Sequence, residues 1–154
     1  MIDYVGGENE IRKFVYSRWL DQAQQVLGVG YIPEMRFQGV EENEPPGVPT
    51  FWARLSVMSL TDQQATLSTC STVAYTRRYR DNGRVVVQLF GPRTGTDASE
   101  KLKKLAQLVQ NRLRGTKTDS GIWFRNARID ANLNAENLFQ RVNVICDYER
   151  DEII

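Results

Sequence analysis

Four arginines close together near the middle of the chain are the densest group of side chains that could do chemistry. Two tyrosines alternate with them, and the group reads Tyr75, Arg77, Arg78, Tyr79, Arg80 and Arg84. Cations interleaved with aromatic rings can follow a phosphate backbone. The same pattern is typical of an exposed edge hairpin that charge protects against unwanted pairing, or of a surface that meets a neighbouring protein subunit. All three interpretations stay open at this point.

Three glutamates, Glu41, Glu42 and Glu44, form the main acidic group. They lie in residues 39–50, whose prolines and glycines predict a flexible surface loop. Such a loop does not hold carboxylates with the accuracy that acid–base catalysis needs. We therefore expect these glutamates to be solvated in a surface loop. In the interface interpretation, the arginines of one subunit face the glutamates of a neighbouring subunit.

The residues on which most enzymes rely are scarce. The chain has no histidine, the commonest general base near neutral pH and the commonest metal ligand. Its two cysteines, Cys70 and Cys146, have no metal-like spacing and are expected to be reduced. Residues 91–95 precede a predicted helix, as an anion-binding turn does, but they lack the spacing of a P-loop. We expect no catalytic site, no metal and no cofactor, and therefore not an enzyme.

Composition limits the class of protein. The 154 residues, 41% hydrophobic and 25% charged, predict one domain with a substantial core. A net charge of +1 gives no general attraction to nucleic acid, and we expect no sequence-specific nucleic-acid partner. No stretch approaches the roughly 20 apolar residues that cross a bilayer, so we expect no membrane partner. The N-terminus lacks a secretion signal, which predicts a protein made and kept in a cytoplasm.

Two amphipathic helices are predicted, each followed by a glycine as a left-handed stop. The first covers residues 9–27, with Asn9 as its expected cap. The second covers residues 97–113, where Asp97 and Glu100 have the spacing of a capping box. The apolar stripe of the second helix is Ala98, Leu102, Leu105, Ala106, Val109 and Leu113.

A β-hairpin is predicted around Asp81-Asn82-Gly83, with arms at residues 73–80 and 84–90. An Asn-Gly pair supplies the positive φ angles that a tight hairpin turn needs. The remaining predicted strands are residues 51–60, 121–129 and 140–149, while residues 31–36 are interpreted only as a short extended piece and are not counted as a strand. The polar segments between elements are predicted loops at residues 61–72 and 130–139. The order α-β-β-β-α-β-β predicts an α+β fold, a mostly antiparallel sheet with both helices on one face.

The order and spacing of these motifs resemble the tail terminator proteins of long-tailed phages with non-contractile tails, the group typified by the lambda tail terminator. The resemblance runs over residues 8–149 and includes no catalytic signature. Its carriers are helix 11–27, loop 42–46 with strand 51–57, segment 83–92, helix 97–113 and strand 140–144. The polar segment 61–72 and the basic hairpin depart from a generic member, so interface residues of the family are not carried over.

The resemblance implies a structural virion protein that forms a homohexameric ring. Such a ring sits on the last ring of tail tube proteins, stops growth of the tube and presents a surface to the head–tail connector or head-completion protein. It is assembled in the host cytoplasm and remains in the neck of the virion. Two alternatives stay open: another neck protein, for head closure or tail completion, and a small nucleic-acid-binding accessory protein that uses the basic hairpin. We expect the hairpin 73–90 and the loops beside strand 51–60 to lie at subunit contacts.

Overall fold

The computed structural model describes residues 4–37, 50–66, 78–93, 97–118, 121–136 and 139–153. Its elements follow the predicted α-β-β-β-α-β-β order. They are α1 (Tyr4–Leu27), β1 (Glu34–Phe37), β2 (Trp52–Thr66), β3 (Arg78–Pro92), α2 (Ala98–Leu113), β4 (Ile122–Glu136) and β5 (Phe139–Ile153). The predicted α+β class is therefore confirmed.

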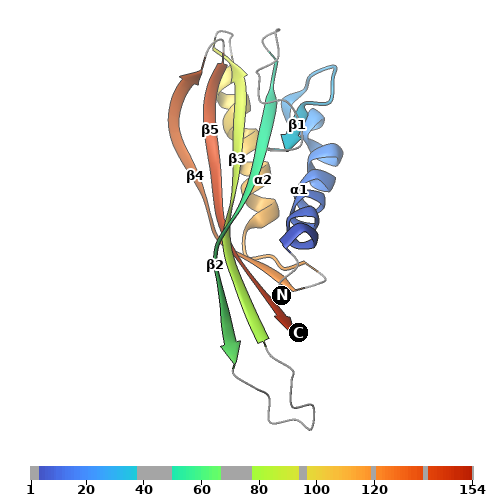
Figure 1. Ribbon diagram of the computed structural model, residues 1–154. Helices are drawn as coiled ribbons and strands as arrows, with labels where there is room; N and C mark the ends of the chain where they lie inside the picture. The colour runs from blue at the N-terminus through green and yellow to red at the C-terminus, as the bar shows by residue number, and fades with distance from the viewer. Residues whose placement is uncertain are drawn as a thin grey trace.

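The five strands form one sheet in the order β1-β2-β3-β5-β4, and both helices cover one of its faces (Figure 1). Only the short β1 runs parallel to its neighbour, β2. The other pairs, β2 with β3, β3 with β5 and β5 with β4, are antiparallel. The sheet is strongly twisted, and its strands cross over one another between the upper and lower halves in Figure 1.

The core lies between the helices and the sheet. All six residues of the apolar stripe predicted for the second helix are buried, and they define the inner face of α2. Alternate strand residues meet them, among them Leu55, Val87 and Val144, which pair across the sheet in register. Each such side chain contributes roughly 1.5–3 kcal/mol when it is fully buried. Packing of alternating strand faces against two amphipathic helices thus forms the fold.

The N-terminal ends of both helices differ from the sequence prediction. Helix α1 begins at Tyr4, five residues earlier than predicted, so Asn9 lies inside the helix. The Asn9 side chain does not cap; its oxygen accepts a hydrogen bond from Arg12 at 3.1 Å. Asp97 stands at the N-cap of α2 but makes no side-chain capping hydrogen bond, so the predicted capping box is wrong. Gly28 does adopt the left-handed conformation expected after α1, with φ of 65°.

The predicted turn at Asp81-Asn82-Gly83 is wrong, because β3 runs through these residues without a break. The hairpin is instead made by β2 and β3, which pair from Trp52 opposite Phe90 to Thr66 opposite Arg78. Residues 61–66 and 130–136, expected in loops, are parts of β2 and β4. Residues 67–77, with the rest of the predicted first arm, lie outside the described part of the chain.

Gly83 serves a close approach rather than a turn. A Cβ atom at this position would collide with the ring of Tyr148, which lies opposite on β5, and with the backbone carbonyl of Met58 on β2. Glycine therefore lets the Tyr148 ring lie against β3, as aromatic side chains do over strand glycines. Beyond this point, β2 and β3 continue past the helices as a long arm, with the end of β5 alongside (Figure 1).

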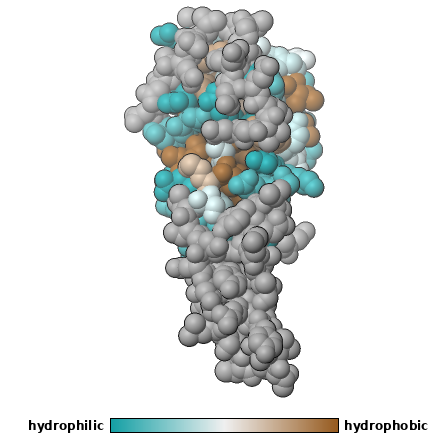
Figure 2. Space-filling model, viewed as in Figure 1, coloured by the Kyte–Doolittle hydropathy of each residue, from teal (hydrophilic) through white to brown (hydrophobic). Residues whose placement is uncertain are grey.

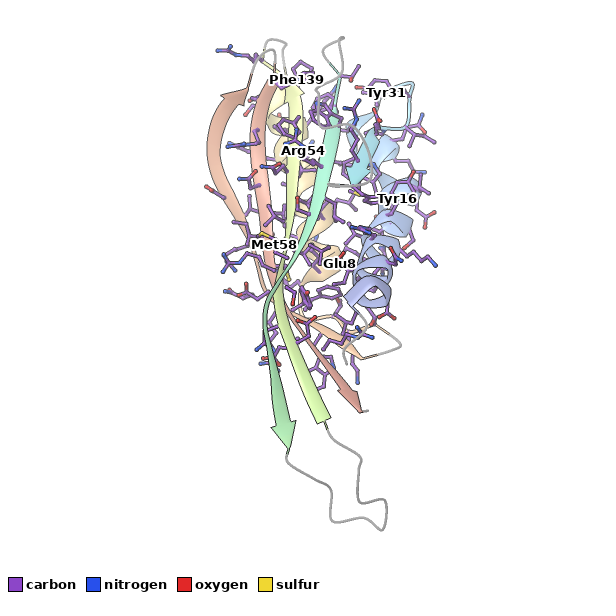
Figure 3. All side chains as sticks on the ribbon, viewed as in Figure 1. Glu8, Tyr16, Tyr31, Arg54, Met58 and Phe139 are labelled. Atoms are coloured by element: carbon purple, nitrogen blue, oxygen red, sulfur yellow. The ribbon has the colours of Figure 1, made fainter. Side chains whose placement is uncertain are left out.

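A second, smaller hydrophobic cluster lies on the face of the sheet away from the helices. Trp52 and Phe90 are fully buried and stack with ring centroids 4.2 Å apart, and Phe139 packs edge-on against both. The guanidinium of Arg54 lies over both stacked rings, at 5.4 Å from Trp52 and 5.3 Å from Phe90. Arg54 and Phe139 are labelled in Figure 3, at the end of the sheet opposite the arm. This end is therefore packed on both faces.

Replacing Gly83 by alanine should destabilise the fold by about 1–3 kcal/mol, because the added methyl group meets backbone as well as a ring and cannot be relieved by rotating one side chain. Gly30→Ala is the matched control, since a Cβ there has open space around it. Urea unfolding of both variants measures the difference. Equal midpoints for the two variants would show that the Tyr148 contact does not restrict residue 83.

The thiol of Cys146 should be unreactive in the folded protein. It is fully buried on the core face of β5, and burial raises its pKa to about 12, so the thiol stays protonated at pH 8. Cys70 lies outside the described residues, so the measurement uses Cys70→Ser protein. A disulfide exchange reagent should label this variant only after urea is added. Rapid labelling without urea would contradict the burial of Cys146.

Candidate assembly surfaces

The structure describes only part of the predicted interface. Arg84 lies in the middle of β3 with its side chain on the face away from the helices. The backbones of Arg78 and Arg80 lie in the arm portion of β3, in register with Ile153 and Asp151 of β5. Arg77 and the glutamates Glu41, Glu42 and Glu44 lie outside the described residues. The contact between arginines and glutamates therefore remains a prediction.

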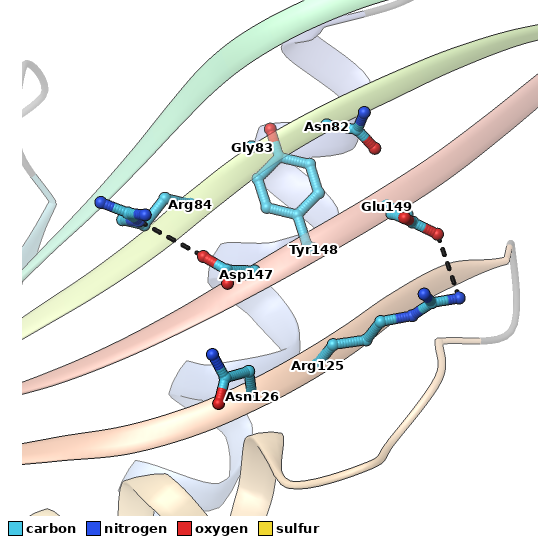
Figure 4. Close-up of a pocket in the computed structure, with 8 residues that line it drawn as sticks. All are labelled: Asn82, Gly83, Arg84, Arg125, Asn126, Asp147, Tyr148 and Glu149. Atoms are coloured by element: carbon cyan, nitrogen blue, oxygen red, sulfur yellow. Dashed lines mark hydrogen bonds and ion pairs between the residues drawn. The ribbon is translucent and has the colours of Figure 1, made fainter.

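Arg84 is already engaged within its own chain. Its Nε atom lies 3.3 Å from Oδ1 of Asp147 on β5, and Arg128 on β4 lies 3.5 Å from the other oxygen of the same carboxylate. Further along the same two strands, Arg125 of β4 pairs with Glu149 of β5 at 3.1 Å (Figure 4). The side chains of Arg84 and Asp147 are each 41% exposed. Exposed pairs of this kind contribute little to stability, about 0–1 kcal/mol, but they fix the charge pattern of the face.

These ion pairs border a hollow of about 460 Å³ at the base of the arm. Its floor includes Gly83 and Tyr148, and Asn126 lines one side, in a left-handed conformation with φ of 56° beside a bulge of β4. Burial, followed by the neighbouring Asp81, raises the pKa of Tyr148, so its hydroxyl stays protonated. The hollow thus offers paired charges and amide groups, a surface suited to polar contacts with another protein.

The rest of this face is mixed in character. Val86 and Ile145, directly opposite each other on β3 and β5, are half-buried, and Met58 on β2 is 46% exposed. Figure 2, which views this side, shows hydrophobic patches set among hydrophilic ones across the described part of the surface.

Two edges of the sheet lack a further strand within the described residues. On one side, β1 covers β2 only as far as Leu55, and β2 continues for eleven residues more. On the other side, the segment around Lys117 bridges to Trp123, and beyond Phe124 no described segment pairs with the outer side of β4. Backbone donors and acceptors along such edges can pair with another chain.

A basic groove between α1 and α2 was not anticipated from the sequence. Arg112 of α2 crosses it: its Nε donates to the backbone oxygen of Phe14 at 2.8 Å, and its guanidinium lies 3.7 Å from the centre of the Phe14 ring. Hollows of about 400 and 240 Å³ lie on either side of Arg112. Lys13 and Lys117 line the first, and Arg18 lines the second. The sequence shows these cations, but they lie about a hundred residues apart, and only the packing of α1 on α2 brings them together.

The described residues show neither a candidate metal cluster nor a membrane-spanning helix. They contain no group of three or more His, Cys, Asp or Glu side chains placed to hold a metal ion. Neither described helix is long and apolar enough to cross a membrane.

Comparisons with known proteins identify the fold. No protein family model matches the chain, and no curated protein does. One solved structure, whose name states no function, is 16% identical with a TM-score of 0.56, and the match covers 92% of this chain and 94% of the other. A chain from the virion of a native gene transfer agent particle is 15% identical with a TM-score of 0.41, over 90% of this chain and 92% of that one. The first of these similarities shows that most of the chain adopts a fold already seen in a protein of nearly the same length.

Proposed function

We propose that this chain is a structural virion protein, a phage tail terminator that closes the tail tube by forming a ring. The observation that carries the proposal is the pair of open edges on opposite sides of one sheet, on β2 and on β4. The sequence resemblance to tail terminators supports the same role. Such a pair of edges suits a ring of identical copies, because a head-to-tail contact uses two different surfaces on each subunit.

The directions of the strands favour joining these two edges. β2 is antiparallel to β3, β3 to β5 and β5 to β4, so β2 and β4 run in opposite directions. When β4 of one copy meets β2 of the next, the antiparallel alternation continues across the junction. The open stretches are also offset along the strands, because β2 is open towards the arm and β4 towards the other end. They overlap at one level, where Met58 lies in the same cross-strand row as Arg125, and a junction at this level brings Met58 of one copy close to Arg128 of the next.

The other surfaces then suit axial contacts. A ring of this kind has two end faces, one for the tail tube protein and one for the head–tail connector or head-completion protein. The two-sided core keeps one end of each subunit rigid, while the arm extends away from it. The proposed location is the virion neck, after assembly in the host cytoplasm.

Joined edges should allow a disulfide between copies. Met58 and Arg128 lie on the same face of the sheet and are exposed, at 46% for Met58 and 38% for the Arg128 side chain. Within one chain three strand spacings of about 4.8 Å separate them, about 14 Å, which is too far for a disulfide. In Cys70→Ser protein carrying Met58→Cys and Arg128→Cys, oxidation should produce a ladder of covalent oligomers that ends at the hexamer. Light scattering on the unoxidised protein measures the ring itself.

The matched control combines Met58→Cys with Lys104→Cys, since Lys104 is exposed on the helical side. This variant should not form the ladder. Hexamers without cross-links would reject the edge assignment and leave the ring. A protein that stays monomeric at all concentrations, and does not limit the length of tubes formed by its cognate tube protein, would reject the tail terminator.

A further inference from the structure

The groove between α1 and α2 carries a surplus of positive charge, because four cations line it together with one carboxylate, that of Glu10. Lys13, Arg18, Arg112 and Lys117 line it, and none of the four forms an ion pair with a carboxylate within the described ranges. Asp21 offsets part of the charge on Arg112, but burial and the neighbouring Arg18 together lower the pKa of Arg112. The lowered pKa is the expected effect of a cation held beside another cation.

The other face of the sheet shows the opposite arrangement. There Arg84 and Arg128 share Asp147, and Arg125 pairs with Glu149. An acidic partner therefore gains less around this cluster, where Arg84, Arg125 and Arg128 already have a carboxylate. The groove is the stronger site for an acidic ligand among the described surfaces.

We propose that the groove binds the acidic segment at residues 41–44 of a second copy of this chain. That segment has three glutamates in four positions, and residues 38–53 contain no lysine or arginine. Its carboxylates match the guanidinium fork of Arg112 and the ammonium groups of Lys13 and Lys117. The proposal rests on the ring proposed above and names one of its contacts between copies.

A second copy fits better than the same chain because both ends of the segment are held away from the groove. Phe37, just before it, packs edge-on against Tyr16 and under Arg12, on the other flank of α1 from Phe14. After it, the backbone N–H of Phe51 donates to the hydroxyl of Tyr31 at 3.0 Å, beyond the C-terminal end of α1. Within the same chain, the segment would have to pass over α1 near Lys13, which lines both hollows, and then return to Phe51, whereas a segment from a second copy carries no such constraint.

Contacts of this kind orient copies more than they hold them together. The groove cations are at the surface, where ion pairs are weak singly and are screened by salt. The contact should therefore speed and direct the assembly of the ring, and its effect should fade as the salt concentration rises.

The test measures binding of a fluorescent peptide of residues 38–50 to full-length protein in which Glu41, Glu42 and Glu44 are glutamines, so that the protein's own segments do not compete. Lys13→Gln with Lys117→Gln should weaken binding about fivefold or more at low salt. Lys101→Gln with Lys103→Gln is the control, because it removes the same charge from the other end of the helical side. The control should change binding less than about twofold, as distant surface charges do. A peptide with glutamines in place of its glutamates should not bind.

Equal binding by the groove variant and the control would overturn the proposal. A short DNA duplex that binds the groove while the peptide does not would also overturn it, in favour of a nucleic-acid ligand. The ring is judged separately, by light scattering of the unaltered chain. Peptide binding without rings would leave the groove assignment standing and reject the ring, whereas rings without peptide binding would do the reverse.

Discussion

The twisted sheet depends on one close contact, the ring of Tyr148 against the backbone of Gly83. Any side chain at position 83 would collide with the Tyr148 ring and with the backbone carbonyl of Met58, and it would push the ring away from β3. The Tyr148 hydroxyl forms a hydrogen bond with Asp81, which lies two residues from Gly83 on the same face of β3. The buried Asp81 carboxylate also accepts a hydrogen bond from Ser59 of β2. A buried carboxylate is stable only with such donors around it. The contact therefore joins β2, β3 and β5 where the hydrophobic core ends and the polar arm begins.

The sequence predicted the elements best where one face is buried. The stripe of α2 and the alternation at Leu55, Val87 and Val144 were recognisable because the core selects apolar side chains at the period of each element. The order of elements and the fold class followed from these segments. The arm was missed for the same reason, because residues 61–66 pair through their backbones and their polar sequence carries no alternation. The end of β4 was missed although Ala131, Leu133 and Ala135 do alternate with polar residues there, because the asparagines and acids of residues 130–136 were interpreted as a loop.

The turn at Asp81-Asn82-Gly83 shows a local signal overruled by tertiary contacts. Asn-Gly is a strong hairpin signal because both residues tolerate positive φ angles, yet the structure uses this glycine for its missing side chain. One sequence feature did point to the strand: residues 81, 83, 85, 87 and 89 continue a single alternation onto the buried face. Reading that alternation through the Asp-Asn-Gly triplet requires knowing that Tyr148 lies opposite, which sequence spacing does not show.

The charged residues divide in a way that the sequence did not indicate. Arg84 is the predicted interface residue whose side chain the structure describes, and the Asp147 carboxylate directly opposite on β5 neutralises it. Antiparallel pairing fixes which side chains are neighbours in this way. The groove cations come from two helices and the segment after α2, and helix packing is not readable from charge patterns in one element. Strand pairing thus neutralises charges within the subunit, and helix packing leaves them unbalanced at its surface. In the proposed ring, the unbalanced side has the greater electrostatic influence on how the copies meet.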